Sequence, residues 1–163
     1  MTTPSAASGP PDGTDNGPGA RFRHISEGMG FLLWKVSLAW QRAIRAALDP
    51  HELTHVQFVL LASVGWLGES EETPTQQRIA EHLGVDTMMT SQVLRRLAAR
   101  QLISRELDER DARARRIVLT DAGRDLLTVA RADVEATDIA FFAALGPDGP
   151  AFLRGLTMLS DDE

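Results

Sequence analysis

The sequence predicts a mainly α-helical fold with one small β-hairpin, arranged as a winged helix-turn-helix between amino- and carboxyl-terminal helices. Three observations within residues 73–120 lead to this fold class. Two helical patterns are separated by a two-residue turn, two short alternating runs follow them, and a charged loop lies between these runs. Helix, turn, helix and then hairpin is the order of elements in a winged helix-turn-helix.

The first helix of this stretch is expected from about Thr75 to Leu83. Thr73 is its expected N-cap, because Pro74 would then take the first helical position. Gln76, three residues after Thr73, would complete a capping box. The chain is therefore expected to enter this helix directly from residue 73.

The second helix is expected from its N-cap, Asp86, to about Arg100, after a tight turn at residues 84–85. Its inward face at helical spacing consists of Thr90, Val93, Leu94 and Leu97. Its outward face has no carboxylate and consists of Thr87, Met88, Ser91, Gln92 and Arg95. Hydrogen-bonding groups, a methyl group and a cation suit base edges and phosphates in a major groove. An ordinary solvated helix face is the alternative interpretation.

The hairpin decides between these two interpretations. Residues 102–107 and 115–119 alternate as strands, and residues 108–114 form the loop between them. Loop and second strand together hold Arg110, Arg113, Arg115 and Arg116. A purely structural loop would more often turn with Gly, Asn or Pro. Guanidinium groups suit phosphates and a narrow minor groove, and Asp111 is close enough in sequence to orient Arg113. The loop therefore favours DNA binding.

The string DERDARARRIVLTDAG, residues 108–123, resembles the wing signature of the MarR family of bacterial transcriptional regulators. That signature combines an Asp-x-Arg pair, here Asp111 and Arg113, with a hydrophobic strand, Leu-Thr and a glycine, here Gly123. The string DTMMTSQVLRRLAARQLI resembles the family's recognition helix. The string LTHVQFVLL resembles the helix that precedes the reading head, which is the helix-turn-helix of about residues 75–100. The resemblance covers about residue 25 to the end of the chain. It departs from the family at Gln101, where glycine is common, so either Gln101 takes a left-handed backbone or the end of this helix differs.

Three further helices are expected over about residues 25–48, 120–145 and 148–159. Thr54 and Gln57 form a capping box for the helix before the reading head, and Thr120 caps the long helix after the hairpin. The first helix is apolar on more than one stripe, as expected for a helix that packs against both its own domain and a partner. In the resembled family the first helix and the last two interlock with a second copy.

The resemblance thus implies a homodimer with one MarR-like domain per chain, residues 21–163. Residues 21–50 and 121–160 would dimerise, and residues 53–120 would form the DNA-binding head. The expected function is sequence-specific regulation of transcription, as a repressor of an inverted-repeat operator on double-stranded DNA. The predicted DNA-binding residues are Thr87, Met88, Ser91, Gln92, Arg95, Arg96, Arg110, Asp111, Arg113 and Arg115.

The resemblance also implies a small, often aromatic and anionic effector bound between the dimer helices and the reading head. Trp34, Trp40 and His55 lie on helices that would line such a crevice, with aromatic faces for stacking and an imidazole for hydrogen bonding. Tryptophan on an apolar helix is also typical of a plain core position. A winged-helix module that binds proteins or small molecules without reading DNA is the alternative function.

The distribution of charge agrees with a DNA-binding head on an acidic body. The net charge is −6, but residues 86–119 carry eight arginines against five acidic residues, a net of +3. The remaining residues carry nine basic and eighteen acidic side chains, a net of −9. Since phosphate attraction is local at physiological screening lengths, the head determines the interaction with DNA.

Composition limits the other classes of function. Residues 1–20 are rich in Pro, Gly, Ser, Thr and Asp and are expected to be a disordered tail. No apolar run approaches the length of a membrane span, and no leader pattern is present, so a cytoplasmic location is expected. The chain has no cysteine, which excludes disulfides and thiol nucleophiles. Because no catalytic or cofactor motif appears, neither an enzyme nor a cofactor is expected. His51 and His55 are four residues apart, but His51 precedes the Thr54 cap, so no metal site is expected.

Overall fold

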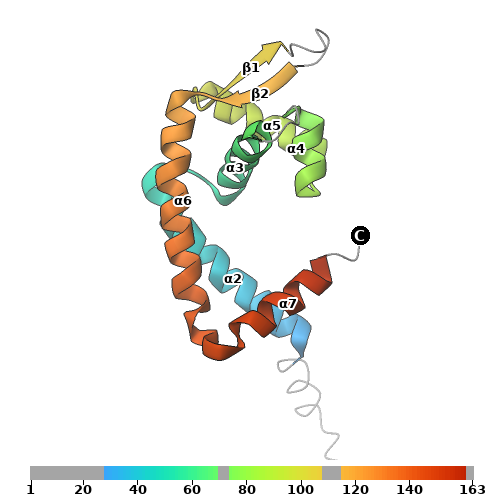
Figure 1. Ribbon diagram of the computed structural model, residues 1–163, viewed down its shortest axis with the longest axis vertical. Helices are drawn as coiled ribbons and strands as arrows, with labels where there is room; N and C mark the ends of the chain where they lie inside the picture. Colours follow the sequence, from blue (N-terminus) through green and yellow to red (C-terminus); the bar gives the residue numbers. More distant parts are fainter. Residues whose placement is uncertain (1–27, 70–73, 108–114, 161–163) are drawn as a thin grey trace, which may run out of the picture. The chain divides into compact units, whose positions relative to one another are not determined.

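The structure is a computed structural model that describes residues 28–69, 74–107 and 115–160 (Figure 1). The described residues fall into two units, which divide between Ala39 and Trp40. Helix α2 (Met29–Leu48) begins in the first unit and ends in the second. None of the helices in the described ranges has the length and apolar character needed to cross a membrane.

Within its described residues the second unit is helical except for one hairpin, which confirms the predicted fold class. Its elements are, in order, η1 (Asp49–His51), α3 (His55–Glu69), α4 (Gln76–Leu83), α5 (Thr87–Ala99), β1 (Ile103–Leu107), β2 (Arg115–Leu119), α6 (Asp121–Phe142), η2 (Ala143–Asp148) and α7 (Gly149–Ser160). The two strands are antiparallel, with Ile103 opposite Leu119. Residues 108–114, between the strands, lie outside the described residues.

Two predicted helix starts are confirmed by their hydrogen bonds. The capping box at the start of α3 is reciprocal: Thr54 N donates to Gln57 Oε1 at 2.9 Å, and Gln57 N donates to Thr54 Oγ1 at 3.2 Å. At the start of α5, Asp86 Oδ1 accepts from Met89 N at 2.9 Å. Both caps were identified from spacing alone because they act within one turn.

The predicted N-cap of α4, Thr73, is wrong by two residues, and the helix starts one residue later than expected. Thr75 is the N-cap, and its hydroxyl accepts from Arg78 N at 3.2 Å. Pro74 precedes the cap, because its carbonyl accepts from Ile117 N of β2 at 2.8 Å and keeps the segment extended. Gln76 does not serve a capping box; its amide donates to Thr87 O at 3.5 Å. Thr73 lies outside the described residues.

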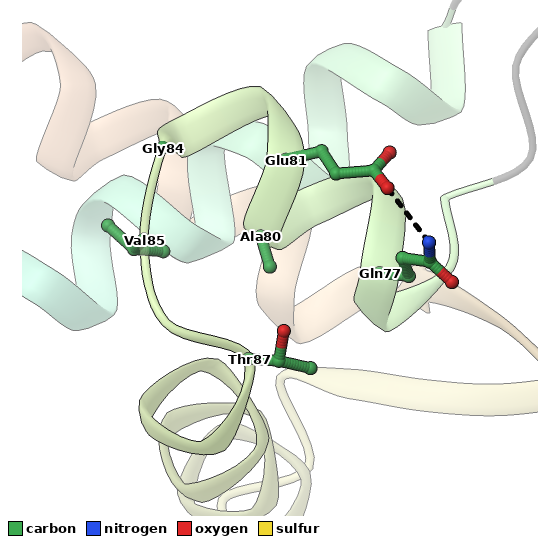
Figure 2. A pocket seen from close by; sticks show the side chains of 6 residues that line it. All are labelled: Gln77, Ala80, Glu81, Gly84, Val85 and Thr87. Atoms are coloured by element: carbon green, nitrogen blue, oxygen red, sulfur yellow. Dashed lines mark hydrogen bonds between the residues drawn. The ribbon is translucent and has the colours of Figure 1, made fainter.

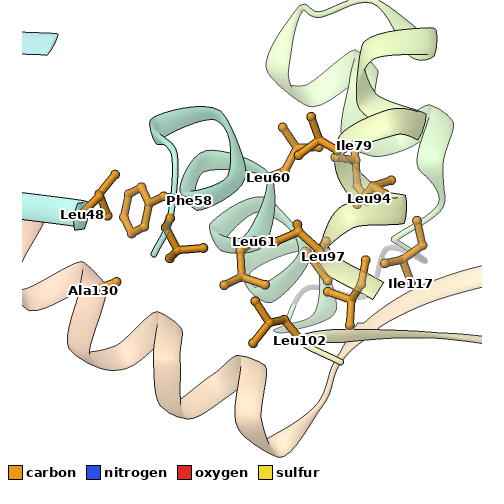
Figure 3. Packing of buried hydrophobic residues seen from close by; sticks show 14 of the residues in the cluster. Leu48, Phe58, Leu60, Leu61, Ile79, Leu94, Leu97, Leu102, Ile117 and Ala130 are labelled. Carbon is orange, nitrogen blue, oxygen red and sulfur yellow. The ribbon is translucent and has the colours of Figure 1, made fainter. Parts of the chain in front are cut away.

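Helix α3 is the centre of the core. It packs against α4, α5, α6 and β2, and Figure 3 shows side chains of these elements converging on it. The whole predicted inward face of α5 is buried: Thr90, Val93, Leu94 and Leu97. Thr90 is the one polar member, and its hydroxyl donates to Asp86 O at 3.0 Å. The burial of this face leaves the opposite face of α5 outside the core.

The start of α6 is locked onto the end of α5. Gln101 has φ of 58°, which confirms the left-handed backbone expected there. Thr120 donates from its hydroxyl to Gln101 O at 2.7 Å and from its amide to Leu102 O at 3.1 Å, and its hydroxyl also accepts from Gly123 N at 3.0 Å. A Cβ on Gly123 would lie 1.9 Å from Leu102 O. The glycine of the predicted wing signature is therefore required by a close backbone approach.

The carboxyl-terminal helices leave apolar side chains uncovered. Helix α6 ends at Phe142, three residues before the predicted end, and a kink at Gly146, with φ of 49°, leads into α7. Helix α7 has no buried residue. Large apolar side chains exposed on α6 and α7 are Val129, Ile139, Leu153, Leu156, Met158 and Leu159.

Candidate nucleic-acid interface

Helix α5 presents the predicted reading face to the outside. Met88 is 70% exposed, and Thr87, Gln92, Arg95 and Arg96 are exposed as well. Ser91 is half-buried. The structure therefore gathers six of the predicted DNA-binding residues on one helix: Thr87, Met88, Ser91, Gln92, Arg95 and Arg96.

The two exposed arginines of α5 are available to a partner. Arg95 Nε donates to Ser91 O at 3.3 Å, which aligns this side chain along its own helix. Within the described ranges, neither Arg95 nor Arg96 forms an ion pair with a carboxylate. Unpaired guanidinium groups beside a polar face suit the phosphates that flank a groove.

The turn between α4 and α5 fixes the two helices relative to each other. Gly84 has φ of 59°, and its amide donates to Glu81 O at 3.1 Å. A hollow of about 410 Å³ lies beside this turn, and Figure 2 shows the side chains that line it. Among the described residues that line it, Glu81 is the one charged side chain, and it accepts from Gln77 Nε2 at 2.8 Å. The hollow therefore offers no cation to an anionic ligand.

The arginines of the hairpin have two different roles, since Arg116 is structural and the others are predicted to bind DNA. Arg116 faces Glu106 across the strands, and its Nη2 and Nε donate to Glu106 Oε2 at 2.8 and 3.2 Å. This pair stabilises the hairpin itself. Arg115 is the first residue of β2. The predicted Arg110, Asp111 and Arg113 lie outside the described residues.

Arg100 is a residue that sequence reasoning missed. It is the C-cap of α5, and its Nη1 donates to Glu52 O at 2.6 Å and its Nη2 to His51 O at 3.4 Å. These carbonyls lie 48 and 49 residues away in sequence. The available signal was a cation at a helix carboxyl end beside Gln101, the predicted left-handed residue.

Two of the three predicted effector residues meet in the second unit. Trp40 Nε1 donates to Asp138 Oδ1 at 2.7 Å, and the Trp40 ring packs edge-on against His55 at 5.1 Å. Burial lowers the pKa of His55, and the charge of Asp138 opposes this effect. Trp34 belongs to the first unit and is exposed. Trp40 and His55 thus already have partners within the chain.

A larger cleft lies elsewhere, between α3 and α6, and has a volume of about 670 Å³. Its aromatic wall is Trp66, which is 57% exposed and stacks on His82 with 4.7 Å between ring centroids. None of the three predicted effector residues lines this cleft. The signal that could have identified it is Trp66 itself, a large aromatic side chain on the helix that follows the Thr54–Gln57 capping box. Further lining residues are Phe58, Val59, Ala62, Ser63, Leu119, Leu127, Thr128 and Val134.

The charges at the rim of this cleft balance. Arg124 and Arg131 face it together with Glu69 and Glu135. Arg131 Nε donates to Glu135 Oε1 at 2.6 Å, and this hydrogen bond raises the pKa of Arg131 above its ordinary value. Arg124 Nη1 donates to Leu119 O at 2.7 Å. The cleft therefore combines an exposed aromatic face with two guanidinium groups.

The histidine pair considered in the sequence lies on two elements. His51 is in η1, where its Nε2 lies 2.6 Å from Asp133 Oδ2, whereas His55 is the first residue of α3. Across residues 28–69, 74–107 and 115–160 no group of three or more potential ligands could hold a metal ion.

Comparison with known proteins places this architecture among transcriptional regulators. The family model described as MarR family matches residues 53–114. The uncharacterized HTH-type transcriptional regulator YdcH of Bacillus subtilis (strain 168) is 38% identical over 144 residues, which cover 88% of this chain and 97% of YdcH.

Solved structures of CouR share the fold over most of both chains. CouR from Rhodococcus jostii RHA1 bound to p-coumaroyl-CoA is 29% identical and has a TM-score of 0.71, covering 83% of this chain and 92% of CouR. The transcriptional repressor CouR bound to a 23-mer DNA duplex is 27% identical and has a TM-score of 0.75, covering 84% and 95%.

Proposed function

The chain belongs to the MarR family of transcriptional regulators, and we propose from this that it is a ligand-responsive repressor acting as a homodimer on an inverted-repeat operator. The observation that carries the proposal is the outer face of α5, which is exposed, polar and free of carboxylates. The net charge of +3 over residues 86–119 supports it. CouR, a relative of similar fold, is a repressor that binds DNA.

The reading residues divide into two roles. Ser91 and Gln92 contact base edges, because their short polar side chains project from the outer face of α5. Arg95 and Arg96 contact phosphates and hold the helix in register. In the wing, Arg113, flanked by Arg110 and Arg115, binds in the minor groove. The Asp111 carboxylate orients the Arg113 guanidinium.

The uncovered apolar surface supports a homodimer. Helix α7 has no buried residue, and Ile139 of α6 and Leu153 of α7 are both largely exposed. Exposed apolar patches of this kind mark an interface. A second copy of the chain is the expected partner, since α2 also exposes apolar side chains such as Leu33 and Trp34.

DNA binding by a dimer is tested with DNA from upstream of the protein's own gene. We expect the wild-type chain to shift this DNA in a mobility-shift titration and to protect an inverted repeat whose half-sites are about one helical turn apart, roughly 34–36 Å. Sedimentation at micromolar concentration should show a dimer. A dimer that binds no DNA above the level of random sequence would instead indicate the alternative, a winged-helix module for other partners.

We propose that the cleft between α3 and α6 holds the effector, with an aromatic ring on Trp66 and an anionic group toward Arg124 or Arg131. The aromatic portion of p-coumaroyl-CoA, the ligand in one CouR structure, fits this description. Because the family consists of transcriptional regulators, we infer that the ligand is a signal and not a substrate. We also infer that the protein acts in the cytoplasm, where its DNA is.

Effector binding is expected to change tryptophan fluorescence when p-coumaroyl-CoA or salicylate is added. The three tryptophans are Trp34, Trp40 and Trp66, so Trp66→Phe should abolish the change and Trp40→Phe should preserve it. The opposite pattern would move the effector to the Trp40–His55 cluster. If neither ligand alters fluorescence or DNA affinity up to millimolar concentration, both ligands are excluded as effectors.

A further inference from the structure

We propose that Arg100 is a positioning residue for DNA reading, and that it holds the carboxyl end of the recognition helix α5 through the turn between α2 and α3. Asp133 of α6 fixes the same turn through His51. The orientation of α5 is thereby coupled to the middle of α6 through this turn, in addition to the hydrogen bonds that Thr120 makes to residues 101 and 102 at the start of α6. The inference rests on the proposed function, because it assigns a role within DNA binding.

Arg100 clamps the turn, because its guanidinium donates hydrogen bonds to two main-chain carbonyl oxygens. Its Nη1 lies 2.6 Å from Glu52 O and its Nη2 lies 3.4 Å from His51 O, while the Glu52 carboxylate is 3.9 Å away. The Arg100 side chain is only 31% exposed. A planar guanidinium can bridge two adjacent carbonyls, which a lysine ammonium cannot do with the same geometry.

The turn that receives Arg100 is itself held rigidly. Glu52 has φ of 54°, a left-handed backbone, and its amide donates to Asp49 O at 3.0 Å. Leu53 N donates to Leu48 O at 3.3 Å, and the Leu53 side chain is buried. A displacement of this turn therefore carries the end of α5 with it and is not absorbed within the turn.

The other side of the turn is attached to α6. His51 Nε2 lies 2.6 Å from Asp133 Oδ2, and the His51 side chain is only 13% exposed. Residues next to Asp133 on α6, namely Arg131, Val134 and Glu135, line the cleft between α3 and α6. A ligand that shifts this part of α6 against α3 consequently displaces the turn. Through Arg100, the turn then displaces the carboxyl end of α5.

The decisive variant is Arg100→Lys, which keeps the charge and loses the clamp. We expect operator affinity to fall about tenfold, as for a partial loss of base contacts. Affinity for random DNA and the slope of affinity against salt should stay unchanged, since no phosphate contact is lost. Arg45→Lys is the matched control, because Arg45 is an exposed arginine of α2 outside the proposed DNA-binding residues, and it should behave like wild type. If Arg100→Lys retains full operator affinity, the clamp has no positioning role.

The second variant tests the role of α6, and its expected effect on operator affinity is opposite to the effect that simple electrostatics predicts. Asp133→Ala removes a negative charge, which by itself would tighten DNA binding, but the proposal predicts weaker operator binding. Asp125→Ala removes the same charge from an exposed position of the same helix and serves as control. The double variant Arg100→Lys/Asp133→Ala should be no weaker than the weaker single variant, because both act through one turn. Additive losses, or Asp133→Ala matching Asp125→Ala, would overturn the relay.

The readout is the ratio of operator to random-DNA affinity within one preparation, which a partly unfolded fraction leaves unchanged. A wild-type chain without operator preference would refute the proposed function itself. Variants that match a wild-type chain with such a preference refute only the role of Arg100 and Asp133.

Discussion

Gly123→Ala is expected to lower the free energy of unfolding by about 3 kcal/mol or more, the upper range for forced overpacking. The added Cβ would lie 1.9 Å from Leu102 O and 2.9 Å from the Leu102 carbonyl carbon. These are main-chain atoms, so no side-chain rotation relieves the clash. The start of α6 would have to move away from the end of α5, breaking the hydrogen bond from Thr120 N to Leu102 O.

Urea unfolding followed by circular dichroism at fixed protein concentration measures this loss. Gly68→Ala is the matched control, since Gly68 is in α3 and its Cβ would meet nothing within 4 Å. Alanine there should be neutral or stabilise by up to about 1 kcal/mol. Equal stability of the two variants would mean that α6 does not approach Leu102 as closely as described.

Gln92→Ala is expected to weaken operator binding by about 1–3 kcal/mol while leaving binding to random DNA nearly unchanged. Gln92 is exposed in the middle of α5, and its side-chain amide makes no hydrogen bond within the residues that the structure describes. Its amide is therefore free to pair with a base edge, and its removal should not alter stability. Binding isotherms on the operator and on a scrambled duplex measure both effects.

Arg96→Ala provides the contrast for this prediction. It should weaken binding to all sequences alike and reduce the salt dependence by about one unit, because a phosphate contact releases counterions whatever the sequence. If Gln92→Ala weakens operator and scrambled duplex equally, the division between reading and holding residues is wrong.

The sequence alone determined the order of elements, the inward face of α5 and several helix starts. Thr54, Asp86 and Thr120 cap their helices as predicted, and Gln101 takes the expected left-handed backbone. Each of these features depends on residues within about one turn of each other, so spacing and side-chain chemistry are sufficient to predict it.

The tertiary structure decided the features that join distant residues. The N-cap of α4 is Thr75 and not Thr73, because Pro74 O accepts a hydrogen bond from Ile117 N, 43 residues further along the chain. Trp40, a predicted effector residue, donates a hydrogen bond to Asp138, 98 residues away, and Trp66 lines the cleft between α3 and α6. Periodicity places a side chain on one face of its own helix, but which distant groups meet that face depends on how the helices pack.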